Sequence, residues 1–321
     1  MDKRLIYEIP QNEKFDLYIL IKNANVRTDR NGRDFIAFTF QDKSGTIDGM
    51  YWSAMEDEVE AFQSGRVVRL KGHRELYNGQ PQVKISGLRL AHDGEPNDPS
   101  LFIADGPMKV EDMKAEIEAG IKSIMHPVLK KIVGSIMTEY DDIFYQYPAA
   151  KRHHHAFVGG LAFHTVSMLR LAQAIAKLYP NVDKSLLYAG VILHDAAKVI
   201  EFVDPLSGDY SIEGNLIGHI SLMGQKISLT AEQLGYRQDE EAVVLLKHMI
   251  LAHHGKNEFG SPVTPRLLEA EILHRVDDLD AKINMMTSHL QDVEPGEYTP
   301  KIMGLEGRSF YHPSDDYYQN I

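Results

Sequence analysis

The residues of this chain best suited to chemistry are histidines and aspartates in short, separate segments: His164, the pair His194–Asp195, His219, the pair His253–His254, and Asp277. They lie on segments with helical periodicity, spaced about one helix and one loop apart. Imidazole and carboxylate groups together are ligands for divalent metals. One carboxylate among several imidazoles could bridge two metal ions and generate a hydroxide nucleophile near neutral pH. The set therefore points to hydrolysis of a phosphate ester.

Each of these residues also has a simpler explanation when it is taken singly. A lone histidine in an apolar helix, such as His164 or His219, is more often a core residue with satisfied hydrogen bonds. The pair His253–His254 ends an apolar helix, where a cationic imidazolium is favoured. Asp277 could pair with nearby cations, which are Arg275 and Lys282. A metal centre is preferred because it explains the whole set together.

The segment Ser185–Phe202 is predicted to form one helix that carries His194, Asp195 and Lys198. Spacings of three and four residues place these side chains on adjoining faces of the helix. The residues around them are small or apolar, so the polar groups point toward a poorly hydrated place and need partners or a metal. A plain salt bridge between Asp195 and Lys198 is the alternative.

Composition places the chain among ordinary water-soluble proteins. It has 321 residues, 43% of them hydrophobic and 25% charged, which is enough for two domains with separate cores. No run of about 18 apolar residues predicts a membrane span, so no membrane association is expected. The first residues lack the apolar core of a secretory signal, and there is no cysteine. Together these features favour a cytoplasmic protein without disulfides or thiolate metal sites.

The charge of the chain bears on its partners. A net charge of −12 argues against general, high-affinity binding of a nucleic-acid duplex, which requires many neutralised phosphates. Residues 12–90 are nearly balanced, with 12 Lys and Arg against 11 Asp and Glu, so the acidity lies in the remainder. Short, single-stranded nucleic acid held partly by base stacking is compatible with this distribution.

Residues 1–90 are predicted to be an all-β domain. Five β-rich runs alternate with turn-forming pieces between residues 12 and 90, and Ala54–Phe62 is typical of a helix between the third and fourth runs. Five strands with a helix in that place favour a small Greek-key barrel of the OB type. The segment resembles the OB-fold nucleic-acid-binding domains, in which single strands stack on aromatics near Lys or Arg.

Candidate contacts to nucleic acid are the aromatic and basic residues of these runs: Trp52, Phe35, Phe38, Tyr77, Arg33, Arg69 and Arg74. The competing interpretation is that aromatics at alternating strand positions form the core of the barrel. Residues 91–108 are rich in Pro, Gly and Asp and are predicted to be a linker. Residues 109–290 have helical periodicity, with a helix starting near Pro127, and are expected to form an all-α bundle. Residues 291–321 are an irregular tail.

The order of the metal-binding candidates resembles a known signature. His164, then His194–Asp195, then Asp277 is similar to the H…HD…D pattern of the HD-domain metal-dependent phosphohydrolases, with HDxxK completed by Lys198. The extra histidines at 219, 253 and 254 are similar to those of HD enzymes that hold two metals. A barrel of the OB type followed by this pattern resembles the YhaM-type 3′–5′ exoribonucleases across nearly the whole chain.

The resemblance implies a role for each residue. The first metal would be held by His164, His194, Asp195 and Asp277. Asp195 would bridge to a second metal on His219 and His253, with His254 a further ligand or a phosphate contact. Asp278 and Asp280 compete with Asp277, and we prefer Asp277, with Asp280 supporting the ligands from behind. The resemblance also implies a contact of Lys198 with the reacting phosphate. His154 and His155 are weaker candidates for substrate contact, and Arg308 in the tail could close the site or pack on a neighbouring subunit.

The implied function is metal-dependent 3′–5′ exonucleolysis of single-stranded RNA to nucleoside 5′-monophosphates, with single-stranded DNA as a further substrate. Two divalent ions are expected, Mn²⁺ being favoured by the resemblance, while Co²⁺, Fe²⁺ and Zn²⁺ also suit nitrogen and oxygen ligands. Two alternatives stay open: a phosphohydrolase of small or cyclic nucleotides, and a non-catalytic single-strand binding protein. A homo-oligomer is compatible with the sequence.

Overall fold

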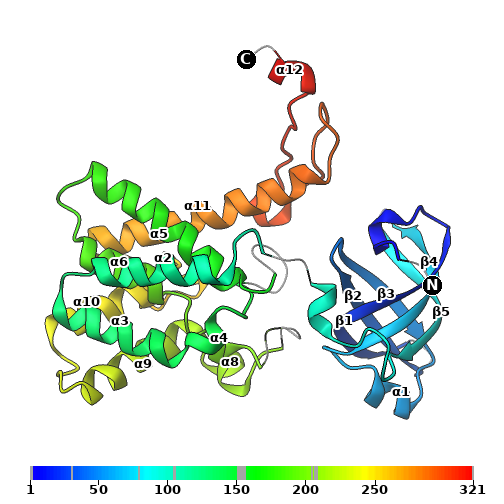
Figure 1. Ribbon diagram of the computed structural model, residues 1–321, viewed down its shortest axis with the longest axis horizontal. Helices are drawn as coiled ribbons and strands as arrows, with labels where there is room; N and C mark the ends of the chain where they lie inside the picture. The colour runs from blue at the N-terminus through cyan, green and yellow to red at the C-terminus, as the bar shows by residue number, and fades with distance from the viewer. Residues whose placement is uncertain are drawn as a thin grey trace. The chain divides into compact units, whose positions relative to one another are not determined.

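The chain has two compact units. The computed structural model describes residues 3–29, 32–78, 80–103, 106–149, 157–203, 205 and 209–319. One unit comprises Met1–Gly106 with Phe202–Asp209, and the other comprises Pro107–Glu201 with Tyr210–Ile321. The first contains a β-barrel and the second a bundle of helices (Figure 1), so the predicted fold class is confirmed.

The barrel is a closed sheet in the order β1-β2-β3-β5-β4. Its strands are β1 (Lys14–Thr28), β2 (Asp34–Asp42), β3 (Gly45–Trp52), β4 (Val67–Tyr77) and β5 (Gln80–Leu90). Neighbouring strands are antiparallel except β3 and β5, which are parallel. Closure leaves no free edge among the strands that the structure describes. The predicted helix between the third and fourth strands is present as α1 (Glu56–Ala61), and short 3₁₀ helices lie at η1 (Ile6–Glu8) and η2 (Pro99–Phe102).

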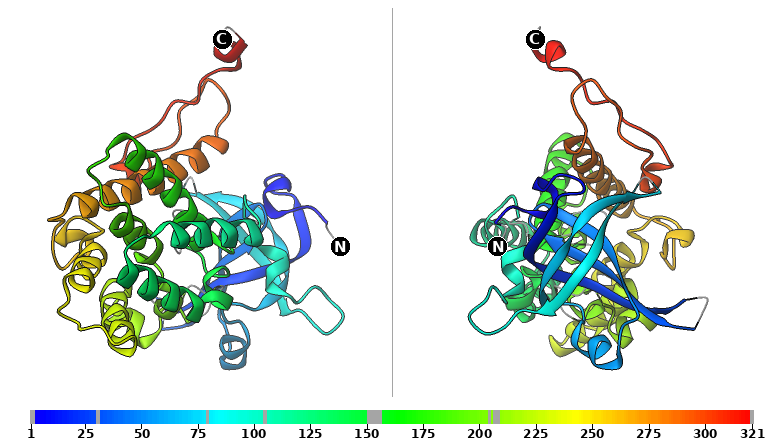
Figure 2. Two further views of the ribbon diagram at one scale, coloured as in Figure 1. Left: turned by 60° about the vertical axis from the view of Figure 1, so that its left-hand side comes forward. Right: turned by 90° about the vertical axis from the view of Figure 1, so that its right-hand side faces the viewer.

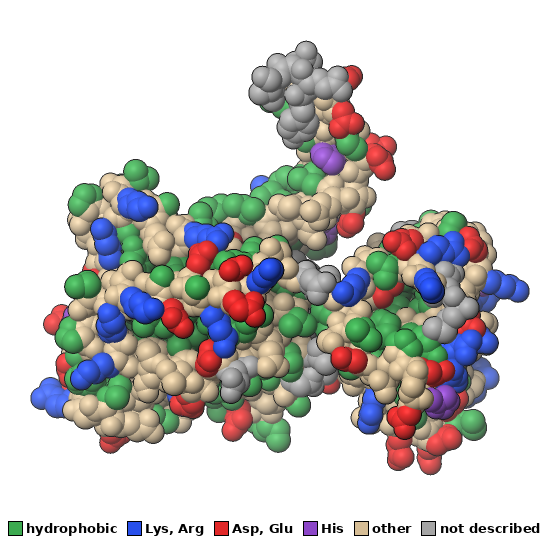
Figure 3. Space-filling view, viewed as in Figure 1, with side chains coloured by type: hydrophobic (Ala, Val, Ile, Leu, Met, Phe, Trp, Pro, Cys, Tyr) green, Lys and Arg blue, Asp and Glu red, His purple; other side chains and the backbone are tan. Residues whose placement is uncertain are grey.

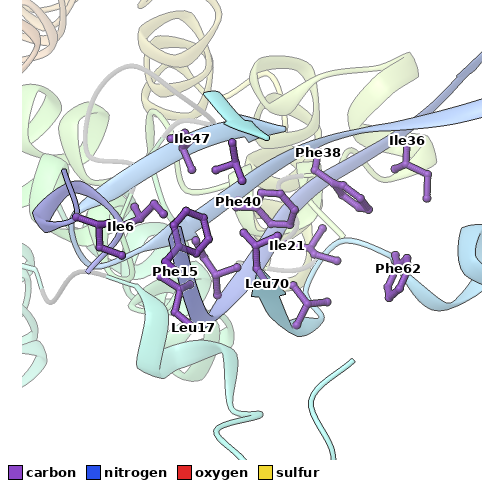
Figure 4. Packing of buried hydrophobic residues seen from close by; sticks show 14 residues of the cluster. Ile6, Phe15, Leu17, Ile21, Ile36, Phe38, Phe40, Ile47, Phe62 and Leu70 are labelled. Atoms are coloured by element: carbon purple, nitrogen blue, oxygen red, sulfur yellow. The ribbon is translucent and has the colours of Figure 1, made fainter. Parts of the chain in front are cut away.

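The interior of the barrel is filled by every second residue of its strands. Along β2 the side chains of Ile36, Phe38 and Phe40 all point inward and are at most 1% exposed. They pack with residues from β1, β3 and β4 and with Phe62 after α1 (Figure 4). Because successive strand residues point to opposite faces, the residues between them on β2 are directed outward. The core therefore fixes which aromatics of the barrel can meet a ligand.

The helical unit is built around α5 (Gly160–Leu178) and α6 (Lys184–Leu193). It also contains α2 (Val110–Ser123), α3 (Pro127–Glu139), α4 (Asp141–Phe144), α7 (Lys198–Glu201), α8 (Ile212–Leu216), α9 (His219–Gln233), α10 (Glu241–Ala252), η3 (Asn257–Phe259) and α11 (Leu268–Gln291). Helix α6 packs against α2, α3, α5, α10 and α11, and α5 also packs against α11. Acidic and basic side chains are interspersed over the face of this unit visible in Figure 3.

Two helices predicted as continuous are interrupted, and that part of the prediction is wrong. The predicted helix Ser185–Phe202 ends as α6 at Leu193, and residues 194–197 form tighter turns before α7. The segment around His219 breaks at Gly218, whose φ of +79° is readily adopted only by glycine. As a result α9 begins at His219 rather than containing it. Both breaks place a candidate ligand at a helix end instead of in a helix interior.

The tail beyond α11 is more regular than predicted. Bridges pair Tyr298 with Tyr311 and Ile302 with Arg308, around the short helix η4 (Met303–Leu305), and α12 (Asp315–Gln319) follows. Figure 2 shows this arm leaving the bundle from the end of α11. Ile302 and Leu305 anchor its base against Met285. Among the described residues, no helix has the length and apolar character needed to cross a membrane.

Candidate metal centre

Two groups of ligand atoms lie inside the helical unit, and Asp195 belongs to one of them and lies close to the other. The first consists of His164, His194 and Asp277, and the second of Asp195, His219, His253 and His254. Within each group the nitrogen and oxygen atoms all lie within 4.8 Å of one another. His164 comes from α5 and Asp277 from α11, while the others lie where α6, α9 and α10 begin or end. Residues more than 100 positions apart in sequence therefore converge.

The five imidazoles are oriented in the same way, by a hydrogen bond from Nδ1. Each directs Nδ1 at an oxygen outside the centre: His164 at Asp280 (2.7 Å), His194 at the Val191 carbonyl (2.8 Å), His219 at Glu201 (2.9 Å), His253 at the Ile250 carbonyl (2.7 Å) and His254 at the Phe259 carbonyl (2.7 Å). A carbonyl or carboxylate oxygen can only accept, so Nδ1 carries the proton in every ring. Nε2 is thereby left to face the centre. This is the arrangement that metal-binding histidines require.

Asp195 occupies the middle of the centre. Its Oδ2 accepts a hydrogen bond from Lys198 Nζ at 2.6 Å, and Lys198 also donates to the carbonyl of Ala149 at 2.7 Å. Its Oδ1 lies 3.3 Å from Nε2 of His219 and 3.8 Å from Nε2 of His253. The salt bridge expected as the alternative to a metal site is thus present, and it leaves the second oxygen of Asp195 facing two imidazoles.

A cation fits these residues on physical grounds. Among the described residues, Oδ1 of Asp195 and Nε2 of His219 and His253 are buried atoms without a hydrogen-bond partner. An unsatisfied buried polar group costs about 1–3 kcal/mol. Three such atoms that face one another, each with a lone pair, are satisfied together by one metal ion. The donor set of imidazole and carboxylate suits a divalent transition metal.

The protonation states of the second group also suit a metal. The pKa of Asp195 lies well below its usual range because Lys198, His194 and His219 together outweigh the effect of burial. Burial, His254 and His194 hold the pKa of His253 well below its usual range, and burial also lowers that of His254. Ionised carboxylate and neutral imidazole are the forms that bind metals.

His164 behaves differently in the metal-free chain. Burial disfavours its imidazolium, but hydrogen bonds to Asp277 and Asp280 prevail and raise the pKa of His164 to about 9. The Nε2 atom lies 3.3 Å from Oδ1 of Asp277. The pKa of Asp277 is lowered because its bond to His164 and the nearby imidazoles outweigh burial. A metal bound by the first group would therefore displace a proton from His164.

The three aspartates near the end of the signature are clearly separated by the structure. Asp277 joins the first group, whereas Asp278 pairs with Lys282 at 2.7 Å on the surface of α11. Asp280, one turn on, supports His164 from the side away from the centre. His254 lies within the second group. The structure thus brings together every residue that the sequence predicts as a metal ligand.

On the barrel, two candidate aromatics stack at the end of the β2–β3 pair that lies farthest from its turn. The rings of Phe35 and Trp52 are 4.6 Å apart with an interplanar angle of 29°. Trp52 is 61% exposed, although it is the kind of residue that usually contributes to a core. Strand register places Phe35 between Trp52 and Arg27, an exposed residue that the sequence analysis did not select. Arg33 is also exposed, beside Asp29.

Three other barrel candidates make contacts within the fold: burial excludes Phe38 as a nucleic-acid contact, and the two arginines stay predictions. Phe38 is 1% exposed because it shares the inward face of β2. Arg69 forms a two-pronged ion pair with Asp16, at 2.7 and 2.8 Å. Arg74 donates from Nη1 to three carbonyls of the N-terminal segment, those of Ile6, Tyr7 and Ile9. A sequence pattern cannot reveal such long-range partners.

The remaining candidates are placed as follows. His154 and His155 lie outside the described residues. Tyr77 is 62% exposed near the end of β4. Arg308 is engaged within the arm, where its Nε donates to the Leu305 carbonyl at 3.0 Å and its guanidinium lies over the Phe310 ring.

Two site residues were missed by the sequence analysis. Glu201 accepts from His219, and its signal was a carboxylate one turn after Lys198 in an apolar segment. His274 donates from Nδ1 to the His253 carbonyl at 3.0 Å. A Cβ at Gly255 would come within 2.3 Å of the His274 ring, so this turn requires glycine.

Comparisons with known proteins agree with both units. The family model of the HD domain matches residues 161–282, and that of the OB-fold nucleic acid binding domain matches residues 21–91. The 3′-5′ exoribonuclease YhaM of Listeria welshimeri serovar 6b is 45% identical over 314 residues, which cover 98% of this chain and 99% of that protein. The 3′-5′ exoribonuclease YhaM of Geobacillus sp. (strain WCH70) is 44% identical over 96% of this chain and 94% of that protein. The chain therefore belongs to the family of the YhaM 3′–5′ exoribonucleases.

Proposed function

We propose that this protein is a metal-dependent 3′–5′ exoribonuclease that shortens single-stranded RNA and releases nucleoside 5′-monophosphates. The observation that carries the metal dependence is the set of unpartnered buried atoms around Oδ1 of Asp195. Family membership supports the direction of cleavage and the class of substrate. We propose single-stranded DNA as a further substrate, because stacking on aromatics does not distinguish the two sugars.

Two ions would be held by the two groups of ligands. His164, His194, Asp195 and Asp277 would hold the first, and Asp195, His219, His253 and His254 the second. When bound, such ions lower the pKa of water and neutralise the charge that develops on phosphorus. Lys198 holds Oδ2 of Asp195, which orients Oδ1 toward the second group, and the ammonium adds positive charge beside the reacting phosphate.

We propose Mn²⁺ as the native metal, with Co²⁺, Fe²⁺ and Zn²⁺ as substitutes, since all of them accept imidazole and carboxylate ligands. Residues 1–90 would bind RNA, 91–108 would link the domains, 109–290 would cleave, and 291–321 would form a separate arm. The absence of cysteine from the sequence suits a cytoplasmic enzyme. A homo-oligomer would be compatible with this arrangement.

The first expected result concerns the reaction itself. A 5′-labelled single-stranded oligoribonucleotide should give a ladder that shortens from the 3′ end with Mn²⁺, and no product with a chelator. The reason is that the bound ions would lower the pKa of the attacking water and offset most of the negative charge that develops on phosphorus. Mg²⁺, Zn²⁺ and a DNA oligonucleotide are assayed in parallel. Internal cleavage, or equal rates with and without chelator, would contradict the proposal, and faster hydrolysis of free or cyclic nucleotides would favour the alternative.

The exposed stack on the barrel gives a second expected result. Trp52→Ala should weaken binding of a single-stranded oligoribonucleotide by roughly 5- to 150-fold, because base–aromatic stacking contributes about 1–3 kcal/mol per base. Binding is measured by fluorescence anisotropy in a chelator, so that the RNA stays intact. Tyr179→Ala removes a comparably exposed aromatic (56% against 61%) from the helical unit and should leave affinity unchanged. Equal affinities for the two variants would remove Trp52 from the interface.

A further inference from the structure

Glu201 is a buried carboxylate beside the second group of ligands. It is the last residue of α7 and is only 7% exposed. Its Oε1 accepts hydrogen bonds from Nδ1 of His219 at 2.9 Å and from the backbone N–H of the same residue at 3.2 Å. Two donors of one histidine thus end on one carboxylate oxygen.

This contact fixes both the ring and the helix that carries it. His219 is the first residue of α9, and helix N-termini leave backbone N–H groups without partners inside the helix. Glu201 accepts from the first of them. The bond to Nδ1 then sets the rotation of the ring and brings Nε2 to 3.3 Å from Oδ1 of Asp195. The position of His219 therefore depends on Glu201.

The two groups of ligands are supported in parallel ways. Three of the imidazoles donate to neutral backbone carbonyls, whereas His164 donates to Asp280 and His219 to Glu201. Each group thus contains one histidine backed by a carboxylate. A negative acceptor raises the basicity of the opposite ring nitrogen, and losing such a partner weakens metal binding about 10- to 100-fold.

We propose that Glu201 is the positioning residue of the second metal site and sets the affinity of that site through His219. Asp280 performs the same task at the first site through His164. The assignment rests on the two-metal centre of the proposed function. It implies that the affinity for each ion can be lowered separately, by changing a residue that contacts neither ion.

The test is a metal titration of the full-length chain. Wild type, Glu201→Gln and Asp280→Asn are stripped with a chelator and titrated with Mn²⁺ by calorimetry, and the electron paramagnetic resonance signal of a coupled manganese pair is followed. Glu201→Gln should weaken one of two binding events about 10- to 100-fold and leave the other unchanged. Asp280→Asn should weaken the other event. Glu241→Gln, at an exposed residue in the first turn of α10, should change neither.

A double variant separates positioning from general damage to the fold. If Glu201 acts through His219, then Glu201→Gln should cause no further loss at the second site in a His219→Ala background. Unchanged events in Glu201→Gln, or equal weakening of both, would overturn the proposal. Should the Gln variant not fold, Glu201→Asp replaces it: a loss confined to one event supports the proposal, and a loss from both overturns it. The titration contains no RNA, so it tests the metal sites independently of the reaction. If the chain binds two ions but does not cleave RNA in a separate assay, the proposed function is refuted and the role of Glu201 is not.

Discussion

Asp195→Asn is expected to reduce the release of nucleotides by about a thousand-fold. Lys198 keeps one side-chain oxygen as acceptor, so the amide nitrogen of the variant would take the place of Oδ1. Its two hydrogens would then face Nε2 of His219 and His253, which lie 3.3 and 3.8 Å from that oxygen. An N–H group cannot bind a cation. Metal ions stabilise the transition state by several kcal/mol, and each 1.36 kcal/mol corresponds to a tenfold change in rate. The measurement is the rate of mononucleotide release from 3′-labelled RNA.

The control for this variant must separate lost chemistry from lost folding. Asp239→Asn changes an exposed aspartate paired with Arg237 and should retain wild-type activity. Thermal unfolding of Asp195→Asn in a chelator should remain cooperative, because the amide still satisfies Lys198. Metal content after gel filtration should fall at the same time as activity. A folded variant that keeps more than a tenth of the wild-type rate, in a preparation without contaminating nuclease, would exclude Asp195 as the bridging residue.

The arrangement of the barrel shows what local pattern can and cannot predict. Alternation in β2 predicted a strand and the position of α1 followed from the order of the runs. Alternation also places Phe35 and Phe38 on opposite faces of β2. It does not show by itself which of the two phenylalanines points inward. The inward face carries Ile36, Phe38 and Phe40, which pack with residues far along the chain such as Phe62. Phe38 was therefore assigned to the wrong side.

The metal centre was predictable because its ligands have unusual chemistry at recurring spacing. The sequence did not predict that the helix breaks at Gly218 or that α6 ends at Leu193, because both residues lie in segments with helical periodicity. Tertiary contacts also act at these ends, such as the hydrogen bond that the backbone N–H of His219 donates to Glu201. Glu201 itself lies 18 residues from His219, too far for any helical spacing to connect them. Supporting residues are thus harder to predict than ligands.

Substituting the neighbouring residues Asp277 and Asp278 gives opposite expected results within one turn of α11. Asp277→Asn should lower RNA cleavage by about 100- to 1,000-fold, because the first group loses its only carboxylate apart from Asp195. Asp278→Asn removes a surface ion pair with Lys282 spaced i,i+4, which contributes about 0.3–0.5 kcal/mol, and should keep activity within about twofold. Both variants are assayed by mononucleotide release and by Mn²⁺ titration.

The pair is informative because the two substitutions are chemically identical and differ only in direction from the helix. Oδ1 of Asp277 lies 3.3 Å from Nε2 of His164, and Asp280 contacts Nδ1 of the same ring. Asp277→Asn therefore removes one of these two carboxylates from His164. The metal-free Asp277→Asn chain should therefore show a lower pKa for His164, below the value of about 9 that the two carboxylates sustain. Histidine resonances in a pH titration measure this shift. The reverse pattern, with Asp278→Asn inactive and Asp277→Asn active, would move the last ligand to Asp278.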